Sequence, residues 1–280
     1  MNLRHLIYII VAGVITTFAA CGNKTEEAKN LTPQEPDDSI VGDSMFYGLV
    51  CDGTSDTVIV VYPMDGGDPV TYSCIDAKHA GKIIGKPTIG DWVGLVICPD
   101  DAGEADMVIN LDQLKGTWTY PVMPQMKDFK HLSKRMQKRM EREALQEMPD
   151  SEKAMYMVPR EYGFSLKRSH VAQAVGRVYT SSTLEDDSPV EYPEVKNYKK
   201  WYAWNGRLIL ISGERTLANM PSDHKPKPNV KDTFDFVSLS DDSLVLELHS
   251  QRYAFHRKAN ALTVNAKAQK AAQKAAEKKL

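Results

Sequence analysis

The stretch LDQLKGTWTY, residues 111–120, decides the fold predicted for the longer part of this chain. Gly116 stands between the leucine-containing half and the strand-like residues Thr117 to Tyr120. Glycine tolerates the backbone bend with which such a strand begins, because it carries no Cβ atom. The stretch therefore predicts the first strand of a β-structure that starts at Gly116.

Further strand signals follow this stretch along the chain. The strongest is KWYAWNGRLILI, residues 200–211, because Asn-Gly between two apolar runs favours a two-residue type I′ hairpin turn. Residues 232–236 and 239–248 predict another hairpin, and residues 253–257 predict a last strand. Residues 162–166 and 172–180 are also strand-like. Together these signals predict an antiparallel, mainly β domain over residues 111–258.

This order of motifs resembles the lipocalin-like domains of Bacteroidota lipoproteins. The motifs are Leu-x-Gly-x-Trp, the Trp-rich Asn-Gly hairpin, a Leu-Ser-x-Asp-x-Leu hairpin and a final aromatic-Arg strand. The resemblance implies an antiparallel β-barrel in which Trp118 plugs the closed end. It also implies a non-catalytic protein whose barrel can hold one small apolar ligand. The sequence departs from the family pattern by inserting a helix after the first strand.

Aromatic residues of this domain are candidates for ligand contacts or for a packed core. Strand alternation puts Trp201 and Ala203 on one face and Tyr202 and Trp204 on the other, without showing which face is inside. A hollow barrel would bind a small hydrophobic ligand. A solid barrel would suit a structural or interaction lipoprotein that binds another envelope protein or an anionic surface. The candidate residues are Trp118, Tyr120, Phe164, Trp201, Trp204, Phe234 and Phe236, and Tyr179, Tyr202 and Tyr253 extend the set.

An inserted amphipathic helix is predicted over residues 128–148. Its apolar residues recur at spacings of three and four, and lysine and arginine side chains occupy the opposite face. The helix either caps the barrel mouth with a solvated cationic back or lies on anionic headgroups or in a partner groove. A short second helix is predicted up to residue 158. The apolar stripe consists of Phe129, Leu132, Met136, Met140 and Ala144.

Residues 45–110 predict a small, separate β-barrel domain that resembles OB-like or SH3-like barrels. Short β-branched runs alternate with turns, and Gly90-Asp91-Trp92-Val93 leads into an apolar strand. Binding of single-stranded nucleic acid requires interleaved basic and aromatic residues. The unit is acidic, and its only lysines are Lys78, Lys82 and Lys86, so no nucleic acid partner is expected.

The N-terminus predicts a secreted, lipid-anchored protein. Residues 6–20 form an uncharged apolar run that is shorter than a membrane span and fits a signal peptide over residues 1–20. Ala19-Ala20-Cys21 resembles a bacterial lipobox, which implies cleavage before Cys21 and attachment of palmitate or similar acyl chains to it. Residues 21–44 are polar and rich in charge, which predicts a disordered tether. We expect the outer membrane as location, either surface-exposed or facing the periplasm.

No catalytic motif stands out in the sequence. Gly-x-Ser-x-Gly, His-Glu-x-x-His, phosphate-loop and Rossmann patterns are missing, so a hydrolase is the least favoured alternative and no cofactor is expected. His249 and His256 lie on neighbouring predicted strands, and Ser169-His170 and Ser222-Asp223-His224 place hydroxyl and imidazole close in sequence. The spacing of Cys51, Cys74 and Cys98 excludes a zinc site and leaves open either one disulfide or three buried thiols.

The Ala/Lys-rich residues 259–280 predict a tail helix capped by Asn265. Lysines share one face of this helix, whereas the remainder is alanine and offers little area to bury. The tail is therefore either a frayed, solvated helix or a segment that binds a partner or an anionic surface.

Overall fold

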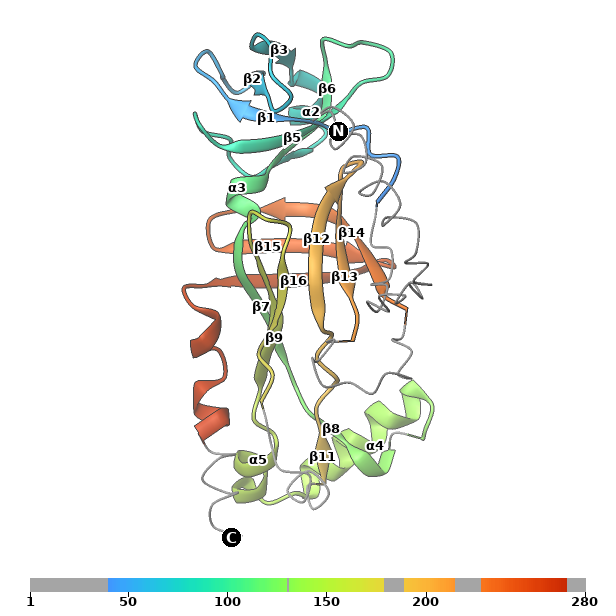
Figure 1. Cartoon of the computed structure of the whole chain (residues 1–280). Coiled ribbons are helices and arrows are strands. Elements are labelled where there is room, and N and C mark those ends of the chain that lie inside the picture. The colour runs from blue at the N-terminus through green and yellow to red at the C-terminus, as the bar shows by residue number, and fades with distance from the viewer. Residues whose placement is uncertain (1–39, 130, 179–188, 215–227, 271–280) are drawn as a thin grey trace, which may run out of the picture. The chain divides into compact units, whose positions relative to one another are not determined.

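Strand pairing organises the chain into two main β-sheets, which Figure 1 shows in the computed structural model. The structure describes residues 40–129, 131–178, 189–214 and 228–270. The predicted signal peptide, the lipidation site at Cys21 and most of the predicted tether lie outside these residues. No helix of the described part is long and apolar enough to cross a membrane.

The first sheet contains six strands in the order β3-β2-β1-β5-β6-β4. Strand β1 pairs antiparallel with both β2 and β5, whereas Ser73, at the end of β3, forms a parallel bridge with Glu104 just before β6. Helix α2 and the two-residue strand β4 lie between β3 and the next long strand, β5. This connectivity is that of a partly open OB-like barrel. Its elements are β1 (Phe46–Val50), β2 (Val58–Pro63), β3 (Val70–Ser73), α2 (Ile75–His79), β4 (Ile83–Ile84), β5 (Trp92–Ile97) and β6 (Ala105–Asn110).

The second sheet is an eight-stranded antiparallel meander in the order β10-β9-β7-β16-β15-β14-β13-β12. Along the chain, β7 is the first strand of this sheet and β16 the last, and these two strands pair with each other. The edges of the sheet are therefore β10 and β12. The two edges approach each other where the Trp201 amide of β12 donates to the carbonyl of His170, just before β10, at 2.8 Å. The barrel is therefore nearly closed. The strands are β7 (Gly116–Val122), β9 (Arg160–Leu166), β10 (Ala172–Val175), β12 (Tyr198–Trp204), β13 (Arg207–Ser212), β14 (Val230–Leu239), β15 (Ser243–Leu248) and β16 (Gln251–Lys258).

This meander confirms the predicted lipocalin-like barrel and mainly β fold. The turn between β12 and β13 falls on Asn205 and Gly206, whose φ angles of 46° and 76° are both positive, as a type I′ turn requires. Trp201 and Ala203 are buried, whereas Tyr202 and Trp204 are half-buried. The inward face of β12, which alternation alone left open, is therefore the face of Trp201.

Shorter elements connect the strands. A four-residue helix, α3 (Leu111–Leu114), follows β6 directly and leads into β7. After β7 come β8 (Gln125–Met126), η1 (Lys127–Phe129), α4 (Lys134–Glu147) and α5 (Asp150–Tyr156), and β8 pairs with β11 (Val190–Glu191) in a third, two-stranded sheet. A 3₁₀ turn, η2 (Ala261–Thr263), follows β16.

The inserted helix is present, but it starts later than predicted. The chain forms the short turn η1 where the apolar pattern began, and α4 starts only after Ser133, whose backbone is extended. Pairing of β8 with β11 and the hydrogen bond from the Lys127 amide to the Pro189 carbonyl at 3.0 Å fix the chain just before the predicted start, and the extended backbone of Ser133 separates η1 from α4. No residue of α4 is buried, so its apolar stripe does not cap the barrel by burial.

The tail helix starts directly after Asn265 as predicted, and the Gln269 amide donates to the Asn265 carbonyl at 2.9 Å, but the Asn265 side chain bonds elsewhere. Residues 266–270 are helical, as expected, and residues 271–280 lie outside the described part. The Asn265 side chain donates to the carbonyls of Glu161 and Gly176 at 2.9 and 2.8 Å and accepts from the Glu161 amide at 2.9 Å. Its amide group therefore ties the tail to β9 and the end of β10.

The two sheets share one hydrophobic cluster within a compact unit that spans residues 38–280. Trp92 of β5 lies 6.2 Å from Trp201 of β12, measured between ring centroids. Met45, Ile84 and Ile109 belong to the same cluster as the barrel residues. The division of the chain at residue 110 into two domains therefore stays a prediction.

Candidate functional site

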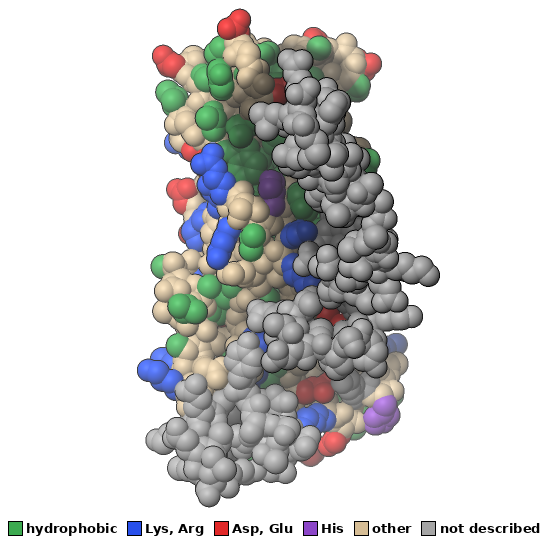
Figure 2. Space-filling model, in the orientation of Figure 1, with side chains coloured by type: hydrophobic (Ala, Val, Ile, Leu, Met, Phe, Trp, Pro, Cys, Tyr) green, Lys and Arg blue, Asp and Glu red, His purple; other side chains and the backbone are tan. Residues whose placement is uncertain are grey.

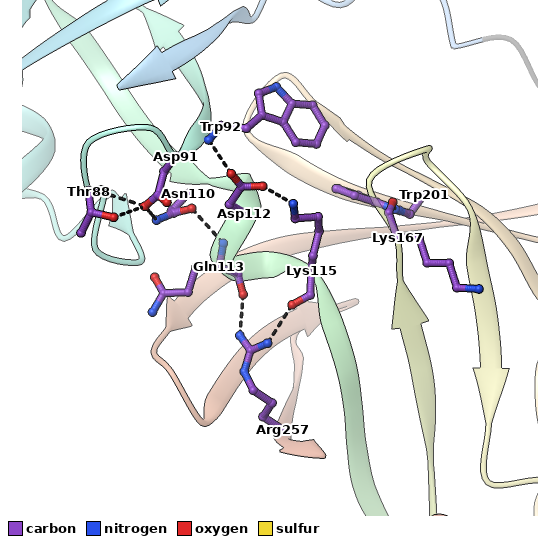
Figure 3. Close-up of polar contacts among 10 residues, drawn as sticks. All are labelled: Thr88, Asp91, Trp92, Asn110, Asp112, Gln113, Lys115, Lys167, Trp201 and Arg257. Carbon is purple, nitrogen blue, oxygen red and sulfur yellow. Dashed lines mark hydrogen bonds and ion pairs between the residues drawn. The ribbon is translucent and has the colours of Figure 1, made fainter. Parts of the chain in front are cut away.

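The floor of the barrel is built by the residues that open and close the meander. Trp118 is fully buried, and its indole Nε1 donates to the Leu114 carbonyl at 2.8 Å. The Arg257 guanidinium lies 4.1 Å from the Trp118 ring centroid. It donates to the carbonyls of Lys115 and Gln113 at 2.7 and 2.5 Å, as Figure 3 shows. A guanidinium above an indole face gains cation–π stabilisation. Trp118 therefore plugs the barrel as the resemblance implied, and it is not available to a ligand.

Gly116 is required by this floor. Its φ angle is +128°, a conformation that residues with a Cβ atom rarely adopt. A Cβ atom at this position would also collide with the Arg257 guanidinium. The glycine in the Leu-x-Gly-x-Trp stretch thus serves both the backbone bend and the close approach of the arginine.

Above the floor, the barrel holds a partly open cavity of about 120 Å³. Three of the seven candidate aromatics line it, namely Tyr120, Phe164 and Phe234. Tyr253, one of the further candidates, lines it as well. Sequence reasoning did not single out the other lining residues, which are Tyr162, Gly163, Glu194, Val195, Lys196, Tyr198, Leu248 and Phe255.

The cavity walls are aromatic rings in edge-to-face contact. Tyr120 and Phe255 meet with centroids 5.2 Å apart at 81°, and Phe164 and Tyr198 meet at 5.9 Å and 89°. Such pairs add stabilisation beyond the area that they bury. The walls are therefore stiff, and they present ring edges and faces to whatever enters the cavity.

One polar cluster adjoins the aromatic walls. The Lys196 ammonium lies 2.6 and 2.8 Å from the two carboxylate oxygens of Asp232, and the Tyr198 hydroxyl lies 3.4 Å from Oδ2. Asp232 is 7% exposed, whereas half of the Lys196 side chain reaches solvent. Paired in this way, the buried carboxylate is tolerated because an ammonium compensates its charge.

Burial determines the ionisation of the tyrosines. Burial, followed by the nearby Asp232 carboxylate, raises the pKa of Tyr198 far above its ordinary value. Burial likewise raises the pKa of Tyr120, with smaller contributions from Tyr253 and Tyr162. Both phenols are therefore neutral at physiological pH, where each can donate or accept a hydrogen bond. The cavity combines apolar surface with a few fixed polar groups, which is typical of sites for small ligands.

The remaining candidate aromatics belong to other parts of the barrel. Trp201 is fully buried, and its Nε1 donates to the Lys167 carbonyl at 2.8 Å. Phe236 is half-buried and packs against the shared hydrophobic cluster. Trp204 lies on the outward face of β12, and neither it nor Phe236 lines the cavity. Tyr179 lies outside the described residues.

The histidines do not assemble with the nucleophiles that their sequence neighbours suggested. The His170 ring stacks on Tyr202 with centroids 5.0 Å apart, and its Nδ1 lies 3.1 Å from the Trp201 carbonyl. His256 pairs with Ser243 near one end of the β15–β16 hairpin, whereas His249 lies in the turn at the other end. The Ser222-Asp223-His224 segment lies outside the described residues.

The structure resolves the question that the sequence left open about the cysteines. Cys51, Cys74 and Cys98 are all free thiols, and only Cys74 is fully buried. Burial raises the pKa of the Cys74 thiol. Within the described ranges, no group of three or more His, Cys, Asp or Glu side chains is arranged to hold a metal ion.

No protein-family model matches the sequence, and no curated protein matches it. Among solved structures, the chain is similar to a lipocalin-like protein from Bacteroides thetaiotaomicron, with 17% sequence identity and a TM-score of 0.26. The match covers 51% of this chain and 94% of that chain. The assignment of a lipocalin-like barrel therefore rests on the strand pairing itself.

Proposed function

We propose that this protein is a lipid-anchored, non-catalytic binding protein of the cell envelope that holds a small, largely apolar group in its lipocalin-like barrel. The cavity above Trp118 is the observation that carries this proposal. Its aromatic walls offer apolar surface, and Lys196 and the neutral Tyr198 phenol, which both contact Asp232, offer hydrogen bonds at one side.

The size of the cavity limits what can enter. A volume of about 120 Å³ is below the roughly 300 Å³ at which sites for whole drug-sized molecules begin. It is close to the roughly 150 Å³ of an apolar protein cavity known to take up benzene. We therefore infer that the barrel holds one ring or a short branched chain, while the rest of a larger ligand would extend beyond Lys196.

A matched pair of variants tests the barrel site. Val195 lines the cavity in the segment before β12, and Val195→Trp should obstruct it while leaving the β-ladder intact. Val230→Trp provides the control, because Val230 is 57% exposed and does not line the cavity. Full-length protein and both variants are purified from the producing cells and compared by native mass spectrometry. A retained mass that disappears only in Val195→Trp supports the proposal, and the same mass in both variants contradicts it.

Lipid attachment has its own test. The proposal expects Cys21 to carry acyl chains, so an alkyne fatty acid fed to the cells should label the wild-type chain but not Cys21→Ser. Two or more acyl chains anchor a protein stably. The variant should therefore move from the membrane fraction to the soluble fraction. Equal labelling of both chains would contradict anchoring at Cys21.

A second candidate function is that of an interaction lipoprotein, and α4 is the observation that favours it. The helix is amphipathic and rich in lysine and arginine, yet none of its residues is buried. Met136 on its apolar stripe is 45% exposed. Flotation of the unacylated Cys21→Ser protein with anionic and zwitterionic vesicles tests this function, because anionic headgroups should retain it and not its Met136→Glu derivative if α4 is a docking surface.

A further inference from the structure

A second, larger cavity lies in the first sheet and is independent of the barrel. Its volume is about 410 Å³, which falls within the range typical of small-molecule sites. The β1–β2 loop, helix α2 and the segment around β4 surround it. Neither the fold prediction nor the proposed barrel function assigns a role to this cavity.

The cavity has an apolar floor and a polar rim. Ile59, Cys74 and Val108 form the floor, and they are 2%, 3% and 1% exposed. The side chains of Lys78 and Lys86 stand at the rim with Asp56. A molecule bound here would bury an apolar body against aliphatic side chains while its polar end stays near two ammonium groups.

The charge distribution makes this rim unusual within its unit. Residues 45–110 contain ten Asp and Glu residues and only three lysines, with no arginine. In the view of Figure 2, carboxylates are spread over the surface of the part of the molecule that carries this sheet. Two of the three lysines nevertheless converge on the same cavity, and the third, Lys82, does not line it.

The two lysines are available to a ligand. Lys78 pairs with Asp56 at 3.2 Å, but the Asp56 side chain is 92% exposed, so water can replace this contact at little cost. Lys86 is exposed, and among the described residues its ammonium forms no ion pair. Its backbone is fixed, because its amide donates to Gln113 Oε1 at 2.8 Å and its carbonyl accepts from Asn110 Nδ2 at 3.0 Å.

We propose that this cavity binds an amphipathic organic anion, in which a carboxylate, sulfonate or phosphate group meets Lys86 and Lys78 and an apolar body lies on Ile59, Cys74 and Val108. The fixed backbone of Lys86 means that only its side chain has to be ordered when a ligand binds. Asp56 opposes the bound anion and competes with it for Lys78.

A pair of fluorescent probes tests the charge requirement on the full chain. 8-Anilinonaphthalene-1-sulfonate is an anion with an aromatic body, and N-phenyl-1-naphthylamine has nearly the same body without the sulfonate. The sulfonate should bind with saturation at one site and several-fold more tightly than the neutral probe. Its affinity should also fall with added salt, because exposed ion pairs are screened.

Charge variants localise the site. Lys86→Gln should lower the affinity for the anionic probe roughly ten-fold, since it removes a charged hydrogen-bond donor. Lys78→Gln should lower this affinity by a smaller factor. Asp56→Asn should raise it, because the substitution releases Lys78 from its ion pair. The matched control is Lys82→Gln, which should change the affinity by less than about two-fold.

Several outcomes would overturn the proposal. They are equal affinity for the two probes, non-saturable binding, or a loss in Lys82→Gln as large as that in Lys86→Gln. If Val195→Trp no longer binds the probe, the probe binds in the barrel, and this result would also contradict the proposed site. Far-UV circular dichroism and the unfolding temperature show whether each variant is folded. Because Val195→Trp addresses only the barrel, failure of one site is distinguishable from failure of the other.

Discussion

The interiors of the two sheets are filled with side chains of different size. The barrel buries large rings, including Trp118, Trp201 and Phe164, and keeps a cavity of about 120 Å³. The first sheet fills its own cluster mainly with valine, isoleucine, leucine, alanine and cysteine, and it has a cavity of about 410 Å³. Protein interiors are otherwise packed to near crystal density. The difference teaches that the barrel fills its interior with rings, and that the first sheet leaves more room for a ligand beside its aliphatic core.

The largest test of this comparison removes the plug of the barrel. Trp118→Ala deletes a fully buried ring and should destabilise the protein by about 3–5 kcal/mol, because the site cannot collapse around the Arg257 guanidinium. Val108→Ala in the first sheet should cost less, since Val108 already borders a cavity. Urea unfolding monitored by circular dichroism measures both changes. Equal losses in the two variants would show that the plug has no special role.

Two ion pairs beside the two cavities offer a smaller test. Lys196→Met leaves the 7%-exposed Asp232 without its ammonium and should cost about 2 kcal/mol, less than a fully buried pair because Lys196 is half-exposed. Lys78→Met leaves a carboxylate that is 92% exposed and should cost less than about 0.5 kcal/mol. Urea unfolding at neutral pH measures both. A loss in Lys78→Met as large as that in Lys196→Met would contradict the assigned difference in burial.

Overpacking gives a finer test of how full each interior is. Ala203→Val adds two carbon atoms to the shared cluster inside the barrel and should cost roughly 2 kcal/mol. Val108→Ile adds one carbon next to the larger cavity and should change stability by no more than about 0.5 kcal/mol. Thermal unfolding followed by tryptophan fluorescence compares the pair. The comparison fails if Val108→Ile proves the more damaging substitution.

Local signals made much of the barrel predictable. Gly116, the Asn205-Gly206 turn and the alternation around Trp201 each act over a few residues, and the structure confirms the strands that they predict. Nearly the whole barrel pattern could therefore be derived from short stretches. The cavity could not, because its walls combine Tyr120, Tyr198 and Tyr253 from strands that are distant in sequence.

The errors have the same physical origin. Helix periodicity predicted a start at residue 128, but the chain forms the turn η1 there, held at Lys127 by the distant Pro189 carbonyl, and α4 begins only at Lys134 after the extended Ser133. The helix begins directly after Asn265 as predicted, but the Asn265 side chain bonds to β9, more than a hundred residues earlier in the chain, and not to the helix. In both cases the sequence shows the local preference but not the long-range hydrogen bond that the same residues make.

The smallest expected effect is a change in how the stability of the protein falls at high pH. Tyr198 is neutral in the folded state, since burial and Asp232 raise its pKa, whereas in the unfolded chain a tyrosine ionises near pH 10. Above that pH the unfolded state releases a proton that the folded state keeps, so Tyr198 lowers stability as the pH rises. Below it, both states bind the proton and the contribution is constant.

Tyr198→Phe should therefore reduce the loss of stability above pH 10 by about 1 kcal/mol per pH unit, after a small cost at neutral pH from the lost contact with Asp232. Urea unfolding at pH 8, 10 and 11 measures this slope. Tyr62→Phe, at a position on β2 that is 45% exposed, is the control for loss of a phenol. An identical slope in Tyr198→Phe and the wild type would mean that the phenol beside the cavity reaches water, and the cavity wall would then be open at this side.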